Sequence, residues 1–171
     1  MNRLRIRDAT PTDAWGIAVV HVATWQSAYV GLLPDSFLQS LSVEKRTASW
    51  SNIIENPPPK SHLLVAMQGE QIVGFISVGT NRDSGSIDQG EVLAIYVDPK
   101  NQGKGIGSDL MKTGILRLKD ENFVSATLWV LEGNSLTRAW YESHGWRADG
   151  ETKRDQRGEI VLNEVRYGID L

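Results

Sequence analysis

The chain has 171 residues, enough for the core of one domain, and its 40% hydrophobic and 23% charged residues are typical of a globular protein rather than a disordered or fibrous one. A formal net charge of −3 without any basic run argues against binding to nucleic acid or to an anionic membrane. The absence of cysteine excludes disulfides, thiolate metal ligands and a cysteine nucleophile, and no apolar run approaches the roughly 20 residues that span a bilayer. We therefore expect one cytoplasmic domain over residues 1–171, without a secretory signal at its arginine-rich start.

The first third of the chain is predicted to hold one strand followed by helices. Leu4 and Ile6 alternate with arginines, which is typical of a strand with one face in water. Thr10 and Pro11 match a helix start, because threonine caps a first turn and proline is tolerated at its first position. The predicted helices of this third cover residues 10–29, 34–41 and 42–56.

The rest of the chain alternates between strand and helix patterns. The run 91–97 is almost continuously apolar and predicts a central strand covered on both faces. This order of elements predicts an α/β fold with one mixed sheet and helices on both of its faces. The predicted strands cover residues 62–67, 72–80, 91–97, 124–130, 147–154 and 160–169, and the predicted helices cover residues 105–121 and 134–145.

A glycine-rich segment lies between the apolar strand and the helix that follows it. Gly103, Gly105 and Gly107 let the backbone turn tightly and approach a ligand without side chains in the way. Main-chain N–H groups at a helix N-terminus favour negative charge, so this loop can bind an anion such as a pyrophosphate. The alternative is a turn that only starts a helix, and the spacing matches neither the P-loop nor the dinucleotide-binding fingerprint.

The stretch from Gln102 to Gly107 resembles the Gln/Arg-x-x-Gly-x-Gly/Ala signature of the GCN5-related N-acetyltransferases (GNAT). The resemblance implies a single-domain α/β fold with a mixed, mostly antiparallel twisted sheet of about 6–7 strands, flanked by helices and splayed at its central strands to admit acetyl-CoA. It also implies a bulge near residues 95–99 and pairing of the pantetheine arm with main-chain groups of Ile95 and Val97. The implied coenzyme contacts are Ile95, Tyr96, Val97, Gln102, Gly103, Lys104, Gly105, Ile106, Gly107, Ser108 and Asn134.

A second motif supports the same resemblance. Asn134, Tyr141 and Gly145 match the family pattern of an Asn at a helix start followed by Tyr-x-x-x-Gly-Phe, with Trp146 in place of the Phe. The resemblance assigns Asn134 to the pantetheine and Tyr141 to the neighbourhood of the coenzyme sulfur, where a phenol can protonate the leaving thiolate. The alternatives are a helix cap for Asn134 and ordinary core packing for Tyr141.

Direct transfer to an amine also requires a group that removes a proton. Glu91 is the first candidate, because it is a carboxylate at the start of an apolar strand and its position resembles that of the base in several protein N-terminal acetyltransferases of the family. The alternative is a glutamate exposed at the rim beside Gly90. A main-chain N–H near Ile95 or Tyr96 would polarise the carbonyl, and no covalent intermediate is needed.

The acceptor side of the family is built largely by the first helices. Trp25 and Tyr29 share one face of the predicted first helix with His21 and are candidate acceptor contacts, the alternative being an aromatic core stripe. None of the three histidines has carboxylate or cysteine neighbours at ligand spacing, so we expect no metal and assign them to surface or packing roles. The polar run 82–88 is predicted as a solvated loop that could border the acceptor entrance.

The predicted function is therefore acetyl-CoA-dependent transfer of acetyl to a primary amine of a small molecule such as an amino acid, a polyamine or an antibiotic-like amine. The alternatives are a peptide or protein N-terminal acetyltransferase and a non-catalytic acetyl-CoA sensor. The expected partner is the small amine, with no nucleic acid and no membrane. A homodimer is plausible because the strand at 160–169 is expected to expose a sheet edge.

Overall fold

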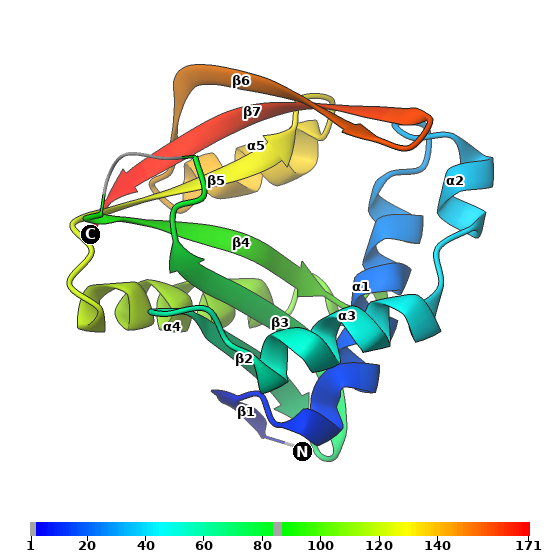
Figure 1. Cartoon of the computed structure of the whole chain (residues 1–171), viewed down its shortest axis with the longest axis horizontal. Coiled ribbons are helices and arrows are strands. Elements are labelled where there is room, and N and C mark those ends of the chain that lie inside the picture. The colour runs from blue at the N-terminus through cyan, green and yellow to red at the C-terminus, as the bar shows by residue number, and fades with distance from the viewer. Residues whose placement is uncertain (1–2, 84–86) are drawn as a thin grey trace.

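Seven strands form one mixed sheet in the computed structural model, which describes residues 3–83 and 87–171 (Figure 1). Their order is β1-β2-β3-β4-β5-β7-β6, and β4 and β5 form the parallel pair of an otherwise antiparallel sheet. The strands are β1 Leu4–Asp8, β2 His62–Gln68, β3 Gln71–Thr80, β4 Gln89–Val97, β5 Ser125–Leu131, β6 Arg147–Arg157 and β7 Ile160–Asp170. The helices are α1 Ala14–Ala28, α2 Asp35–Gln39, α3 Val43–Glu55, α4 Ile106–Asp120 and α5 Ser135–Ser143.

The predicted order of elements and fold class are confirmed, with ends that differ by a few residues. Side-chain caps fix several helix starts: the Ser42 hydroxyl accepts the Lys45 N–H at 3.2 Å before α3, and Asn134 caps α5 in the same way. The segment before α1 is a short 3-10 turn, in which the Asp13 carboxylate accepts the Thr10 N–H at 2.7 Å. The predicted loop at 82–88 and the N-terminal segment lie partly outside the described residues.

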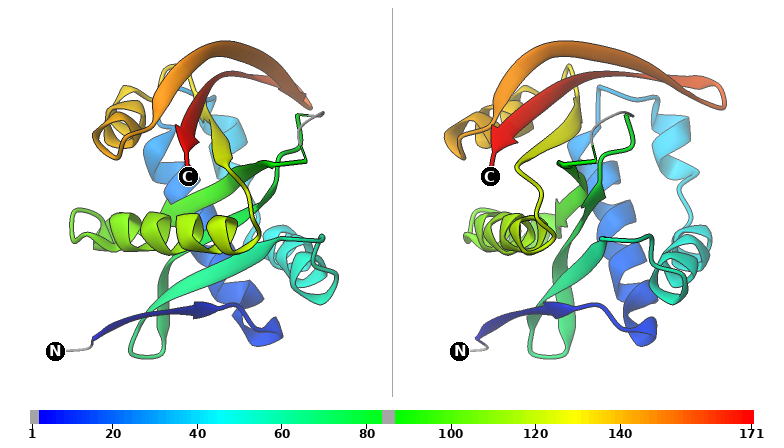
Figure 2. Two further views of the ribbon diagram at one scale, coloured as in Figure 1. Left: turned by 90° about the vertical axis from the view of Figure 1, so that its left-hand side faces the viewer. Right: turned by 60° about the vertical axis from the view of Figure 1, so that its left-hand side comes forward.

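Helices cover both faces of the first half of the sheet, as Figure 2 shows. Alternate residues of β3 point to opposite faces, so Phe75 packs with α1 and α3, whereas Ile76 packs with α4. Gly114 allows α4 to lie close to β3, because a Cβ at this position would come within 2.6 Å of the Ile76 side chain. These two packed layers hold the main strand of the site, β4, in a fixed place.

The sheet opens between β4 and β5. Pairing runs only from Gln89–Val92 on β4 to Ser125–Leu128 on β5, after which the strands diverge. A bulge at Leu93 shifts the β3–β4 register at the point where the divergence begins. The bulge therefore lies before the predicted segment at 95–99. β4 is covered on both faces as predicted, since Ile95 and Val97 pack on the α4 side and Ala94 and Tyr96 on the α1 side, but its second half is less buried because its edge faces the opening.

The strand at 160–169 is not an edge of the sheet, so that part of the sequence prediction is wrong. β7 pairs with β5 on one side and with β6 on the other, which leaves β1 and β6 as the outer strands. The sequence suggested an edge because the polar pattern of β6 gave little sign that it continues to Arg157 along β7. Among the described residues, no helix has the length and apolar character needed to cross a membrane.

Candidate active site

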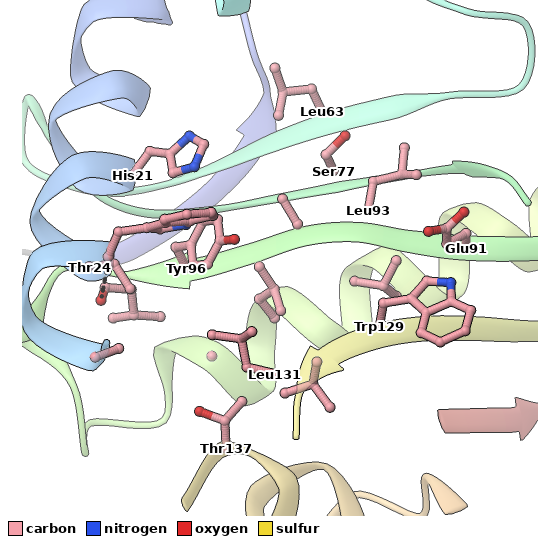
Figure 3. Close-up of a pocket in the computed structure, with 18 of the residues that line it drawn as sticks. His21, Thr24, Leu63, Ser77, Glu91, Leu93, Tyr96, Trp129, Leu131 and Thr137 are labelled. Atoms are coloured by element: carbon pink, nitrogen blue, oxygen red, sulfur yellow. Dashed lines mark hydrogen bonds between the residues drawn. The ribbon is translucent and has the colours of Figure 1, made fainter. Parts of the chain in front are cut away.

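The divergence of β4 and β5 opens a cleft of about 1220 Å³. One wall consists of the second half of β4 and the other of residues 129–131 of β5, and α1, α3, α5 and the glycine loop close the ends. Figure 3 shows Tyr96 of β4 beside His21 of α1, with Glu91 near the other end of β4 and Trp129 of β5 next to it. Main-chain groups on the open edge of β4 beyond Val92 have no partner on β5, so an extended ligand can pair with them.

The glycine loop at one end of the cleft adopts the conformation that its sequence requires. Gly103 and Gly105 have φ of 73° and 82°, and a Cβ at either position would point into open space. Gly105 is the N-cap of α4, so the free N–H groups of the first helical turn point toward the loop. The Gln102 side chain anchors the loop by donating to the Val97 carbonyl at 3.0 Å. This arrangement suits an anion such as a pyrophosphate.

Ten of the eleven predicted coenzyme contacts line the cleft. Lys104 is the exception, because its ammonium turns back to the Lys100 carbonyl at 3.2 Å and the Asn101 side chain at 3.0 Å. Asn134 both lines the cleft and caps α5 by accepting the Thr137 N–H at 3.3 Å, so the predicted cap is present.

Tyr141 lies in the wall of the cleft on α5, 6% exposed and packed against Trp140 and Trp146. Burial raises the pKa of its phenol well above the usual value, so the hydroxyl stays protonated at neutral pH. The Ser108 hydroxyl and the His144 ring, 2.8 Å apart, link α4 to α5 beside it. Tyr141 is thus both a packed residue and a cleft residue.

Glu91 is fully buried, which contradicts the alternative of an exposed rim residue. Its carboxylate accepts the Arg82 main-chain N–H at 2.9 Å and the Arg82 side chain through Nε at 3.2 Å and Nη2 at 2.6 Å. The Arg82 side chain is itself 59% exposed, so this ion pair is open to water on one side. The polar residues after β3 therefore do not form a purely solvated loop, since Arg82 closes over the base candidate.

An aromatic pocket forms the end of the cleft near α1. Trp25 and Tyr29 meet edge to face with ring centroids 4.9 Å apart, and His21 stacks on Tyr96 at 5.1 Å. The hydroxyls of Tyr29 and Tyr96 and the indole N–H of Trp25 face one another, and burial raises the pKa of both tyrosines. These residues are packed together, as the core-stripe reading predicts, and they also line the cleft, so acceptor contact by Trp25 and Tyr29 stays a prediction.

His21 is a neutral member of this pocket. Its Nδ1 accepts the Trp50 indole N–H at 3.1 Å, and burial lowers its pKa to about 3, helped by the positive charges of Arg46 and Arg157. The other two histidines are partly buried, His62 against Glu121 and His144 against Ser108. These contacts fit the packing roles predicted for the histidines.

The sequence analysis missed several charged side chains of the cleft. Arg46 enters it from α3, and Lys153, Asp155, Arg157 and Glu164 enter it from the β6–β7 hairpin. No motif marks them, because they meet the cleft through contacts between distant parts of the chain. Only the helical spacing of Arg46, four residues before Trp50, carried a signal, since it places both side chains on one face of α3.

The comparisons with known proteins agree with this geometry. Residues 25–146 match the profile of the acetyltransferase (GNAT) family. The chain is 30% identical over 163 residues to YuaI, an uncharacterized N-acetyltransferase of Bacillus subtilis, covering 95% of this chain and 91% of the relative. It is 27% identical to a probable N-acetyltransferase of Mycobacterium tuberculosis, covering 88% and 84% of the two chains.

The fold is also that of solved structures. The PaiA N-acetyltransferase of Thermoplasma acidophilum, whose crystal structure contains coenzyme A, superimposes with a TM-score of 0.77 over 99% of each chain at 20% identity. A ribosomal-protein-alanine N-acetyltransferase from Brucella melitensis superimposes with a TM-score of 0.74 at 22% identity, covering 98% of this chain and 99% of the other. At this level of identity the likeness concerns the fold alone.

Proposed function

The chain belongs to the acetyltransferase (GNAT) family and is an acetyl-CoA-dependent N-acetyltransferase, and on this premise we propose that it transfers acetyl directly to the primary amine of a small molecule. The observation that carries the proposal is the cleft between β4 and β5, which joins an anion-binding glycine loop to a pocket of buried aromatic residues. Acetyl-CoA bound at the loop would extend along the cleft toward the pocket, where its thioester would meet the amine of the acceptor.

The residues of the cleft fit the donor. The glycine loop would hold the pyrophosphate, the open edge of β4 would pair with the pantetheine arm, and the Asn134 side-chain amide would reach it from α5. Acetyl-CoA supplies the acetyl group already activated as a thioester. The residues of this chain must then orient the amine toward the thioester, remove a proton from the amine and supply a proton to the sulfur.

The reaction needs one proton removed and one proton supplied. The amine nitrogen forms a bond to the carbonyl carbon, the carbon–sulfur bond breaks, and the departing sulfur is protonated. An alkylamine with a pKa of about 10.4 arrives mostly protonated, so a base is required. Glu91 is the proposed base, directly or through a water, and for an amine held in the aromatic pocket at the other end of β4 water would carry the proton to it. Tyr141, kept protonated by burial, is the proposed donor to the sulfur.

The shape of the acceptor end supports a small amine rather than a peptide. Arg46 from α3 and Arg157 from the tip of the β6–β7 hairpin both lie over the Trp25 ring, with Cζ atoms 5.7 and 5.9 Å from its centroid. Side chains from the two elements therefore converge on one residue, and Figure 1 shows the hairpin reaching across toward α2. An extended peptide would have to cross this contact.

The test is coenzyme A release from acetyl-CoA with two panels, one of small amines and one of peptides with free N-termini. We expect turnover with small amines to exceed turnover with every peptide. Turnover confined to peptides would refute the small-molecule proposal while leaving the transferase activity in place.

The same assay tests the proposed base. Glu91→Gln should lower kcat by roughly 10²–10⁴-fold while the affinity for acetyl-CoA stays the same. Arg82→Lys is the matched control, because it keeps a cation beside Glu91 but removes the forked contact. Equal losses in the two variants, or an unchanged pH profile in Glu91→Gln, would mean that Glu91 only anchors Arg82.

A further inference from the structure

The charged side chains that line the cleft are paired, with one exception. Among the described residues, each charged side chain of the lining other than Arg46 lies within 4 Å of an opposite charge. These ion pairs are Arg82–Glu91, Lys153–Glu164, Arg157–Asp155 and Arg117–Asp8. Arg46 is therefore the one charged side chain of the described lining without an ion-pair partner.

The surroundings of Arg46 disfavour a guanidinium without an anionic partner. It is half-buried on α3, its Cζ lies 5.7 Å from the centroid of the Trp25 ring, and it forms no side-chain hydrogen bond among the described residues. Burial and the charge of Arg157 both lower its pKa, so the position disfavours the cation. A guanidinium has five N–H donors, and each one that the pocket removes from water without an acceptor costs free energy that an anionic ligand would return.

A second donor without a partner lies in the same pocket. The Trp25 side chain is 6% exposed, and its indole N–H, directed toward the Tyr96 hydroxyl, makes no hydrogen bond of regular geometry. Buried N–H groups of native proteins are nearly always satisfied, so an unsatisfied one beside a cavity points to a ligand acceptor. Arg46, which lies over the Trp25 ring, and this indole N–H therefore border the same pocket.

The anion that belongs there is not the pyrophosphate of the coenzyme. Arg46 lies on α3, which packs with α1 on one face of the sheet, whereas the glycine loop leads into α4 on the other face (Figure 2). The coenzyme phosphates would be bound at that loop. The second ligand of the cleft, the acceptor, is the remaining source of an anion for Arg46.

We infer that the acetyl acceptor is an amino acid or a related amine that carries a carboxylate, bound by the Arg46 guanidinium. The inference rests on the proposed function and names its substrate class. A carboxylate is favoured over a phosphate monoester, because one guanidinium balances one negative charge and matches the two carboxylate oxygens, whereas a phosphate carries about −1.5 to −2 at neutral pH. The neutral His21 leaves Arg46 as the cation that sets this preference.

The experiment compares α-, β- and γ-amino acids with their own carboxamides as acceptors, in the unmodified protein, in Arg46→Gln and in Lys45→Gln. Lys45 is the control, since it is an exposed cation next to Arg46 on α3 and does not line the cleft. We expect the unmodified protein and Lys45→Gln to prefer the acids. Arg46→Gln should lose about 10–100-fold in kcat/KM for the acids and leave the carboxamides and the KM for acetyl-CoA unchanged.

Carboxamides used as well as acids by the unmodified protein, or an acid preference that survives in Arg46→Gln, would overturn the inference. If neither series is acetylated, the proposed acceptor class fails as a substrate, and binding decides the role of Arg46. Thermal unfolding is then followed with coenzyme A and N-acetylated amino acids. Stabilisation of the unmodified protein that is lost in Arg46→Gln supports a carboxylate site, and no stabilisation overturns it.

Discussion

His21 shows how its surroundings decide what a single titratable side chain can do. An imidazole beside a candidate acetyl-transfer site has the right chemistry for a base, yet this one is 8% exposed, accepts the Trp50 N–H and faces two arginines. Because its pKa is lowered to about 3, it has no appreciable tendency to take a proton from an amine at neutral pH. It contributes an uncharged ring that accepts the Trp50 N–H and packs against the neighbouring aromatic residues.

The first prediction concerns the effect of His21 on the stability of the folded protein in mild acid. The unfolded imidazole titrates near pH 6.5 and the folded one near pH 3, so below about pH 6.5 the unfolded state binds more protons and the free energy of unfolding falls. At pH 5 the loss should be about 2 kcal/mol. Thermal unfolding between pH 7.5 and pH 5 measures it.

His21→Gln is the control, because the amide oxygen can accept the Trp50 N–H without titrating. It should remove most of the pH dependence above pH 5, and the same dependence in the variant would contradict the assignment. Asp13 acts in a different range, since Arg7 lowers its carboxyl pKa from 3.8 to about 2 and the associated stability is lost only below about pH 4.

The second prediction separates the two roles of Tyr141. Tyr141→Phe keeps the ring that packs against Trp146 and removes the hydroxyl. If the phenol protonates the departing sulfur, kcat should fall by roughly 10²–10⁴-fold with the melting temperature and acetyl-CoA affinity nearly unchanged. A lower melting temperature with normal specific activity would show that the residue serves packing alone.

Sequence motifs located the residues that act through the main chain and left out those that act through distant partners. Gly103, Gly105 and Asn134 could be predicted because a turn or a cap is a local property of the sequence. The contact of Arg82 with Glu91 depends on the register of the β3–β4 hairpin. Arg46 is unpaired because none of the described elements around it places an acidic side chain within reach. No local pattern encodes either fact.

At the scale of elements, the glycine loop combines left-handed backbone conformations, which glycine adopts without strain, with an open surface. Gly105→Ala should weaken acetyl-CoA binding, because φ of 82° is unfavourable for alanine and the new Cβ would point into the space of the proposed phosphates. Isothermal titration with acetyl-CoA measures the loss. This is the third prediction.

Gly150→Ala is a matched control for that variant. Gly150 has φ of 89° and equally open surroundings but lies in β6, away from the glycine loop. Both variants should lose about 1–2 kcal/mol of stability from the strain. Only Gly105→Ala should lose affinity, and equal affinities in the two variants would mean that the loop is simply a turn.

The elements themselves were predictable where the hydrophobic pattern is strong. α4 has a clear helical periodicity and β3 is a nearly continuous apolar run, and their predicted limits differ from the observed ones by at most one residue at each end. β6 has hardly any buried residue, so its end at Arg157 follows from pairing with β7 rather than from its own sequence. The bulge at Leu93 likewise arises from the register between two strands.

At the scale of the whole molecule, the cleft should couple coenzyme binding to stability. Acetyl-CoA at about 100 times its Kd should raise the free energy of unfolding by about 2.7 kcal/mol, which is roughly 5–10 °C in melting temperature for a chain of this size. Thermal unfolding with acetyl-CoA, coenzyme A, ATP and NAD is the fourth test. Stabilisation by the first two alone is expected, whereas equal stabilisation by ATP would point to a general phosphate site.

The short pairing between β4 and β5 also has a mechanical consequence. Four residue pairs join these strands, against seven between β3 and β4 and seven between β5 and β7. The sheet therefore consists of two well-paired halves, β1 to β4 and β5 to β7, joined only by the short β4–β5 pairing. Parallel pairing is also slightly less stable per residue than antiparallel pairing. A force applied across the sheet would separate β4 from β5 before the other strands. A ligand bound between these two strands would resist that separation.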